Sequence, residues 1–246
     1  MKRIAVFTMA LLMLLASSVQ ADLVGLWHLD GNALDYSGNS NDGTLYGGPT
    51  YFSSPMGSAL LFDGLDDYVD CGGSDTLKPT ENITIEMWVN PGSTQNTWAD
   101  ILGGHQNNQG YVVQQDADDL NTYYLAYNNN GTGSGWQGTS IQTQLTANKW
   151  QHFVVQKEGG IIRHYLDGTL TASGSVSGDI YYSPSEPFYM GIGWELTSDR
   201  YFSGAIDEVR IYNHALTEAE IVPVPGAVLL GMLGLSIVGV KLRKRA

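Results

Sequence analysis

Short apolar segments recur along most of the chain, and glycine, asparagine, aspartate, serine and proline separate them. In residues 83–89, apolar side chains at every second position alternate with Thr84, Glu86 and Trp88, which predicts a strand with one buried face. The same reasoning predicts strands at residues 24–29, 59–62, 67–71, 83–89, 111–115, 123–127, 150–157, 161–166, 169–173, 189–192 and 204–212.

Turn signals and strand number together predict the architecture. Asp167-Gly168 separates two predicted strands and favours a type I′ hairpin turn. Thr217 and Glu220 form a capping box, which predicts one short helix. More than ten short strands within about 200 residues indicate an all-β fold, a two-sheet antiparallel jelly-roll sandwich. No internal repeat or linker divides this body.

The amino-terminal residues have the pattern of a secretory signal peptide. Lys2 and Arg3 precede an apolar stretch at residues 4–16, and Val19 and Ala21 form a small-x-small cleavage site. We therefore expect residues 1–21 to be a signal peptide and residues 22–222 to be the exported body. An uncleaved amino-terminal anchor is the alternative.

The carboxy-terminal tail, residues 223–246, has three parts in a fixed order. Pro223 and Pro225 precede an apolar run at residues 226–240, which is followed by a basic cluster. As a helix the run would be roughly 22 Å long, against about 30 Å of bilayer hydrocarbon. A short run with basic residues behind it predicts a segment that halts in the cytoplasmic membrane with its basic end inside. The basic residues are Lys241, Arg243, Lys244 and Arg245.

This tail resembles that of the PEP-CTERM group of bacterial surface proteins, although Val224 stands where that group usually has glutamate. The resemblance implies a sorting enzyme of the exosortase type, a cytoplasmic-membrane intermediate, and final location at the cell surface or in the extracellular matrix. A permanent one-helix anchor in residues 223–246 is the alternative.

Charge is distributed unevenly along the chain. The two terminal segments hold six of the twelve Lys and Arg residues and none of the 25 Asp and Glu residues, so the body carries a formal charge of −19. Such a body repels nucleic acid and anionic lipid, and it is compatible with binding cations. Cys71 is the only cysteine, so no internal disulfide forms, and we expect a buried thiol.

Several phrases resemble the laminin-G-like, concanavalin A-like jelly-roll domains of bacterial exported proteins. They occur at residues 26–30, 35–45, 61–69, 83–89, 150–155, 165–168 and 202–217. The resemblance implies this fold for nearly the whole body. It implies much less about function, because such domains bind glycans or proteins and also accompany enzymes as passengers.

The residues also predict a structural calcium site, which the resemblance implies for many relatives. Simple alternation in the last strand places Asp207 on an apolar face with Val209 and Ile211, where an unpaired carboxylate is costly. If the first and last strands are neighbours, the loop at residues 35–43 lies beside Asp207 and supplies oxygen ligands suited to Ca²⁺. The predicted ligands are Asp35, Asn39, Asn41, Gly43 and Asp207. A hydrogen-bonded loop without metal is the alternative.

Two further groups have competing interpretations. Asp63, Asp66 and Asp67 fit a tight turn at Gly64 better than a second metal site. Among the aromatic residues, we expect Trp27, Trp88 and Trp150 to pack between the sheets. Trp136 and Trp194 instead occur in polar loops, where they predict a stacking site for an exopolysaccharide or surface glycan. Covering an exposed edge of the core is the alternative role.

Motifs for catalysis are missing from the sequence. No strand bears the Glu-x-Asp-x-x-Glu string of laminarinase-like hydrolases, the five histidines have no zinc-binding spacing, and no Gly-x-Ser-x-Gly elbow occurs. We therefore expect a non-catalytic surface or matrix protein. A glycan-active hydrolase or lyase, with carboxylates that meet only in space, is the alternative.

Overall fold

The computed structural model describes residues 23–104, 108–184, 187–193, 196 and 199–221. The predicted signal peptide, the sorting tail and Trp194 lie outside the described residues. Within the described part of the chain, no helix is both long and apolar enough to cross a bilayer.

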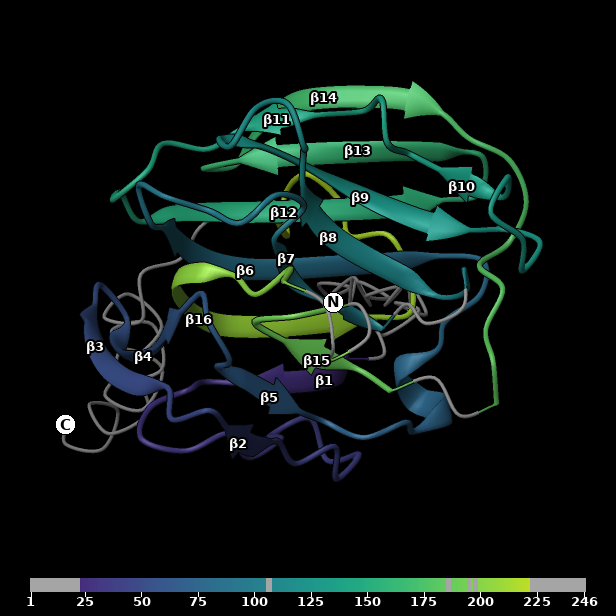
Figure 1. Cartoon of the computed structure of the whole chain (residues 1–246). Helices are drawn as coiled ribbons and strands as arrows, with labels where there is room; N and C mark the ends of the chain where they lie inside the picture. The colour runs from purple at the N-terminus through teal and green to yellow at the C-terminus, as the bar shows by residue number, and fades with distance from the viewer. Residues whose placement is uncertain (1–22, 105–107, 185–186, 194–195, 197–198, 222–246) are drawn as a thin grey trace, which may run out of the picture.

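Two antiparallel sheets make up the fold, and Figure 1 looks through the second sheet onto the first. The first sheet has the order β14-β13-β12-β6-β16-β4-β3, and β1 also pairs with β16. Its strands are β1 (Leu23–Trp27), β3 (Thr50–Ser54), β4 (Gly57–Asp63), β6 (Ile83–Pro91), β12 (Gln151–Glu158), β13 (Ile161–Leu166), β14 (Thr169–Ser175) and β16 (Ser203–Tyr212).

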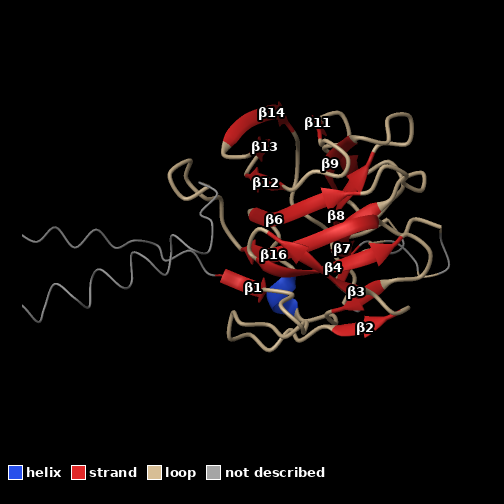
Figure 2. Ribbon diagram, turned by 90° about the vertical axis from the view of Figure 1, so that its left-hand side faces the viewer, coloured by secondary structure: helices blue, strands red, loops and turns tan. Residues whose placement is uncertain are grey.

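The second sheet has the order β10-β9-β8-β7-β15-β5-β2, and β11 also pairs with β9. Its strands are β2 (Thr44–Tyr46), β5 (Tyr68–Asp70), β7 (Asp100–Gly104), β8 (Tyr111–Gln115), β9 (Thr122–Asn128), β10 (Trp136–Gln137), β11 (Thr143–Gln144) and β15 (Tyr189–Met190). A single 3-10 turn, η1 (Asp75–Leu77), lies beside β1 and is blue in Figure 2.

The prediction of a two-sheet jelly-roll sandwich is confirmed, and each of the eleven predicted strands overlaps an observed one. The turn at Asp167 and Gly168 has φ values of 51° and 79°, so both residues are left-handed, as a type I′ turn requires. The capping contacts predicted at Thr217 form, because Glu220 accepts hydrogen bonds from the backbone N–H and the hydroxyl of Thr217. The helix predicted to follow is only a single turn within the described residues.

One apolar core fills the space between the sheets. It contains the inward-facing residues Ile85, Met87 and Val89 of β6, and buried Cys71 joins it. Trp27 is fully buried, stacks on Phe188 with ring centroids 5.7 Å apart, and donates its indole N–H to the Asn41 carbonyl.

The prediction that Trp88 and Trp150 also pack between the sheets is wrong. Trp88 alternates with the core residues of β6, so its ring lies on the outer face, 5.5 Å from that of His152. Trp150 comes just before β12 and stays half-buried at its edge.

His164 of β13 is a polar group inside this core. Its side chain is fully buried, Leu125 N–H lies 3.4 Å from Nε2, and the Thr143 hydroxyl lies 3.3 Å from Nδ1. Burial disfavours the charged imidazolium and lowers the pKa of His164 to about 3. The His164 imidazole is therefore neutral in the folded protein, whereas in the unfolded chain it binds a proton much more readily.

This difference predicts acid destabilisation that depends on His164. Because the folded pKa is depressed from 6.5, the stabilisation is complete above about pH 6.5 and is lost as the pH falls towards 3. Between pH 6.5 and about pH 4.5 the loss should be about 2–3 kcal/mol. Urea unfolding across this range should show a shallower pH slope for His164→Gln than for the wild type. Equal slopes in the two proteins would contradict the assignment.

Candidate functional site

A pocket of about 290 Å³ opens on the outer face of the second sheet. Its floor comes from neighbouring strands, because Val112 pairs with Ala126 and Gln114 pairs with Tyr124 across β8 and β9. We call it the tryptophan pocket. Its lining residues are Trp98, Val112, Gln114, Tyr124, Ala126, Trp136, Thr139 and Arg200.

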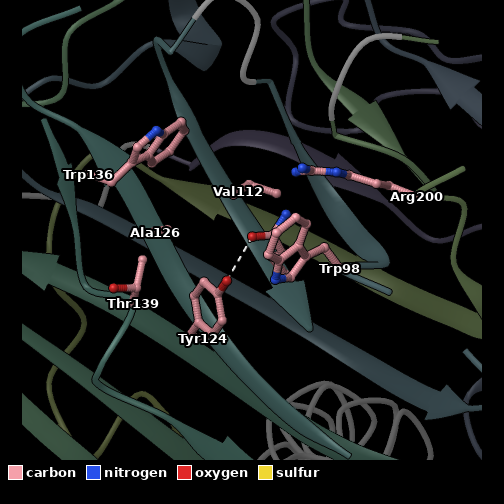
Figure 3. A pocket seen from close by; sticks show the side chains of 8 residues that line it. Trp98, Val112, Tyr124, Ala126, Trp136, Thr139 and Arg200 are labelled. Atoms are coloured by element: carbon pink, nitrogen blue, oxygen red, sulfur yellow. Dashed lines mark hydrogen bonds between the residues drawn. The ribbon is translucent and has the colours of Figure 1, made fainter. Parts of the chain in front are cut away.

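Two indole rings flank the small side chains of this floor. Figure 3 shows Trp136 and Trp98 on either side of Val112. Trp98 is 41% exposed and has a left-handed backbone with φ of 60°, and the Arg200 guanidinium lies 4.8 Å from its ring centroid. Trp136 donates its indole N–H to the Asn108 side-chain carbonyl over 3.3 Å. Both rings are therefore held by contacts and remain at the mouth of the pocket.

A chain of buried hydrogen bonds orients the polar part of the floor. The Tyr124 hydroxyl donates to Gln114 Oε1 at 2.8 Å, and Gln114 Nε2 donates to Asp100 Oδ1 at 2.7 Å. The Gly193 N–H donates to the other oxygen of Asp100, which is fully buried. Burial raises the pKa of the Tyr124 phenol, so this group stays protonated and keeps donating. The amide of Gln114 is thereby fixed in one orientation.

Rigid rings beside fixed polar groups suit a ligand with apolar faces and polar edges. The sequence prediction identified Trp136 for this role and did not include Trp98, which faces it across the floor. The only signal for Trp98 is its position in a polar loop, and that feature does not distinguish a binding residue from a ring that covers the core.

The predicted cation ligands in the loop at residues 35–43 organise the loop itself. The Asp35 carboxylate accepts the backbone N–H groups of Leu26, Ser37 and Asn41, and also the Ser37 hydroxyl. Burial raises the pKa of Asp35, but these hydrogen bonds outweigh burial and leave it lowered. The Asn39 amide donates to the Leu23 and Val24 carbonyls.

The remaining predicted ligands of this loop are also engaged within the protein. The side chain of Asn41 bonds to the Val24 carbonyl and to the Thr76 hydroxyl. Gly43 donates its N–H to Ala33, and a Cβ there would lie 2.4 Å from Val69. First and last strands are neighbours, as predicted, but Asp207 and Asp35 share no hydrogen-bond partner within the described chain.

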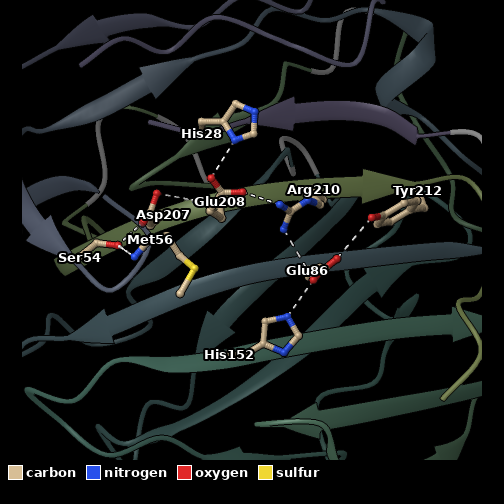
Figure 4. A network of polar contacts seen from close by, with 9 residues as sticks. All are labelled: His28, Ser54, Met56, Glu86, His152, Asp207, Glu208, Arg210 and Tyr212. Atoms are coloured by element: carbon tan, nitrogen blue, oxygen red, sulfur yellow. Dashed lines mark hydrogen bonds and ion pairs between the residues drawn. The ribbon is translucent and has the colours of Figure 1, made fainter. Parts of the chain in front are cut away.

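The predicted face of Asp207 is wrong because a β-bulge interrupts the alternation. Glu208 has φ of 48°, and the register of β16 with β6 shifts between Asp207 and Arg210. As a result Ile206, Val209 and Ile211 all belong to the core. Asp207 lies on the outer face with Glu208 and Arg210 (Figure 4).

Asp207 is nevertheless fully buried, because the β3–β4 hairpin covers it. Its carboxylate accepts the Ser54 hydroxyl and, at 2.8 Å, the Glu208 N–H. Burial is the main cause that raises its pKa to about 7, and the charges of Glu208 and Asp30 add to this. Asp30 accepts the Ser58 N–H at the opposite end of the same hairpin turn. The structure thus brings Asp207 near Asp30, a residue absent from the predicted ligand set.

Beside Asp207, charged residues form a paired network on the outer face of the first sheet (Figure 4). Arg210 bonds to Glu208 and lies 3.7 Å from Glu86. Each glutamate also faces an imidazole: Glu208 lies 2.7 Å from His28, and Glu86 lies 2.8 Å from His152. Arg210 therefore holds both glutamates in ion pairs.

The second acidic group has the predicted turn chemistry. Asp63 accepts the Leu65 N–H, Asp67 accepts the Asp63 N–H, and Gly64 has φ of 79°. Carboxylate oxygens of Asp63, Asp66 and Asp67 lie within 4.8 Å of one another, but the turn accounts for their arrangement.

Comparisons with known proteins agree with this architecture. A family model described as the concanavalin A-like lectin/glucanases superfamily matches residues 62–222. Adhesion G-protein coupled receptor V1 of Danio rerio is 26% identical over 170 residues, which are 66% of this chain and 3% of the receptor. The chain therefore spans only a small part of that relative.

Solved structures share the fold at low sequence identity. Domain 4 of AbnA, a GH43 extracellular arabinanase from Geobacillus stearothermophilus solved with arabinotriose, has a TM-score of 0.67 and 21% identity, covering 82% of this chain and 97% of its own. The binding domain of Paraclostridial Mosquitocidal Protein 1 has a TM-score of 0.67 and 15% identity, and the match covers 86% of this chain and 52% of that one. The binding domain of botulinum neurotoxin DC, solved with SialylT, has a TM-score of 0.61 and 15% identity, and the match covers 86% of this chain and 51% of that one. At these identities the likeness shows the fold alone.

Proposed function

Because the chain belongs to the concanavalin A-like lectin/glucanases superfamily, we propose that it is an exported glycan-binding protein whose binding site is the tryptophan pocket. The observation that carries this proposal is the pair of indoles, Trp98 and Trp136, across a floor of small side chains. Indole faces stack on the apolar faces of sugar rings, and the fixed Gln114 amide offers a partner to a hydroxyl. Two of the solved relatives were determined in complex with arabinotriose and with SialylT.

We propose binding without hydrolysis. Glycoside hydrolysis generally needs two carboxyl groups on either side of the scissile bond. The described residues that line the tryptophan pocket include no aspartate or glutamate. On the other sheet, burial raises the pKa of Glu86, but its contacts with His152 and Arg210 outweigh burial and leave the pKa lowered, which opposes the role of a general acid.

We also propose a structural calcium ion held by Asp207 and Asp30. The donor set fits a hard cation, because the Asp207 and Asp30 carboxylates accept hydrogen bonds from Ser54 and Ser58 at the two ends of one hairpin turn, and the contacts of Asp207 include no Lys or Arg. Asp207 is fully buried and has only a hydroxyl and one N–H as partners, so a bound cation would stabilise its charge strongly. The ion would join the β3–β4 hairpin to β16 and to the segment after β1.

Export and sorting complete the proposed function. The patterns in residues 1–21 and 223–246 support a signal peptide and a tail that is cut near Pro223–Gly226 after a membrane-bound stage. An acidic body delivered in this way would bind polysaccharide at the cell surface or in the matrix.

The glycan proposal predicts that each indole contributes to binding. Arabinotriose and a panel of exopolysaccharides, titrated against the full chain, should bind about tenfold more weakly to Trp98→Ala and to Trp136→Ala, because each variant loses a stacking face. Trp88→Phe, on the opposite sheet, is the matched control and should bind normally. Reducing ends should stay constant throughout. Release of reducing ends by the wild type would instead support the hydrolase alternative.

The calcium proposal predicts a metal-dependent melting temperature. A calcium concentration about a hundredfold above Kd should raise the melting temperature by about 5–10 °C over that in chelator, because the ion binds only the folded state. Asp207→Ala and Asp30→Ala should abolish the response. Asp35→Asn should lower the melting temperature and keep the response, which separates the loop from the ion site. Identical melting curves of the wild type with calcium and with chelator would disprove the site.

The sorting proposal predicts a shortened mature protein. Mass spectrometry of the surface-exposed form should find a carboxy terminus near Pro223–Gly226 and no peptide from residues 241–246. Recovery of Lys241, Arg243, Lys244 and Arg245 from that form would show that the tail is kept as an anchor.

A further inference from the structure

A second pocket, of about 450 Å³, lies on the outer face of the first sheet, opposite the face that bears the tryptophan pocket. Its floor follows one row of the sheet, in which Asn90 of β6 pairs with Ala205 of β16, Ala205 with Leu61 of β4, and Leu61 with Thr50 of β3. Directly opposed residues point to the same face of a sheet, so this row is continuous. We call this cavity the Asn90 pocket.

The small side chain of Ala205 makes the middle of this row hollow. On the β3 side stands the ring of Phe52, which is 43% exposed. On the β6 side stand Asn90 and, from the segment before β12, Asn148. A ring and two amides thus face each other across a floor of Ala205 and Leu61.

Both amides are free to bind a ligand. In the described part of the chain the side chains of Asn90 and Asn148 make no hydrogen bond, although nearby polar side chains such as Asn96 and Gln95 are bonded to backbone carbonyls. Asn148 is held in place through its backbone, which has φ of 57° and donates its N–H to the Pro91 carbonyl. Each free amide offers donors and an acceptor together.

The charge of the lining selects the ligand class. Asp63 and Asp67 stand at one end of the pocket, and its lining includes no Lys or Arg. Anions such as phosphate, sulfate or uronate are therefore disfavoured. Amides that donate and accept, carboxylates that accept, and one aromatic face match the hydroxyl edges and apolar face of a neutral sugar. The volume falls within the range of small-molecule sites, about 300–1,000 Å³.

We infer that the Asn90 pocket is a second binding site, specific for neutral saccharides, on the face opposite the tryptophan pocket. The Asn90 pocket shares no lining residue with the tryptophan pocket, so either site can fail without the other. Two sites on opposite faces would allow one molecule to join two polysaccharide strands.

The test is to titrate the full chain with arabinotriose, xylotriose and cellotriose. Binding is monitored in NMR spectra through the side-chain amide signals of Asn90 and Asn148. At least one sugar should shift both signals, and galacturonic acid trimer should shift neither. Asn90→Ala combined with Asn148→Gly should weaken binding at this site about tenfold, because two hydrogen-bonding groups are lost. Glycine is chosen at residue 148 because it keeps the left-handed backbone without strain.

Two further variants separate the sites. Trp98→Ala should leave the Asn90 and Asn148 shifts unchanged, while Phe52→Ala should reduce them and Phe52→Tyr should keep them. If no neutral sugar shifts the two amides at millimolar concentration, the second site is wrong, even if the tryptophan pocket binds. If the two amide signals shift but the indole signals of Trp98 and Trp136 do not, the result would support the Asn90 pocket and reject glycan binding in the tryptophan pocket.

Discussion

The strand β16 is the element on which the rest of the structure depends. Along one edge it pairs with β6, and along the other it pairs first with β4, through residues 203–206, and then with β1, through residues 209–212. The bulge at Glu208 lies at the change of partner. Because β4 and β1 follow one another along the same edge of β16, the hydrogen-bond ladder is interrupted between them. The extra residue at this interruption redirects the side chains. This interruption is where Asp207, Ser54 and Asp30 gather.

The bulge also explains why the outer face of the first sheet carries so many charges. After Glu208 the alternation resumes one residue out of step, so Val209 and Ile211 still enter the core while Arg210 faces outward. Arg210 then stands between two glutamates, each of which faces a histidine. If the strand continued from Ile206 in strict alternation without the bulge, Arg210 would point into the core, and burying that charge unpaired would be very costly.

The sequence predicts the fold well because the central strands obey simple periodicity. Residues 111–115 and 161–166 were predicted with the observed bounds. The strands that were missed, such as β2 and β3, are edge strands with exposed side chains, so no buried face imposes a pattern on them. β7 was missed for the opposite reason, because it is buried throughout and ends in two glycines.

The candidate binding sites are harder to predict because they depend on the register between strands that are distant in sequence. Trp136 was identified from its loop, but nothing local reveals that Trp98 faces it or that Gln114 connects Tyr124 to Asp100. The sequence predicts Asp207 on the apolar face beside the loop at residues 35–43, whereas the structure places it on the outer face under the β3–β4 hairpin. The bulge at Glu208 causes this difference, and it has no sequence signature other than an ordinary glutamate in a strand.

The floors of both candidate pockets are built from strand positions that the core between the sheets does not use. The tryptophan pocket takes Val112, Gln114, Tyr124 and Ala126, all outward-facing on β8 and β9, while the core takes Tyr111, Val113 and Leu125 between them. The Asn90 pocket likewise takes Ala205 and leaves Ile206 to the core. Because strand residues alternate between faces, substitutions at the outward positions can change what is bound with little cost to packing. This separation explains how one sandwich can serve domains with different ligands, and it means that ligand identity must be sought in the outward residues alone.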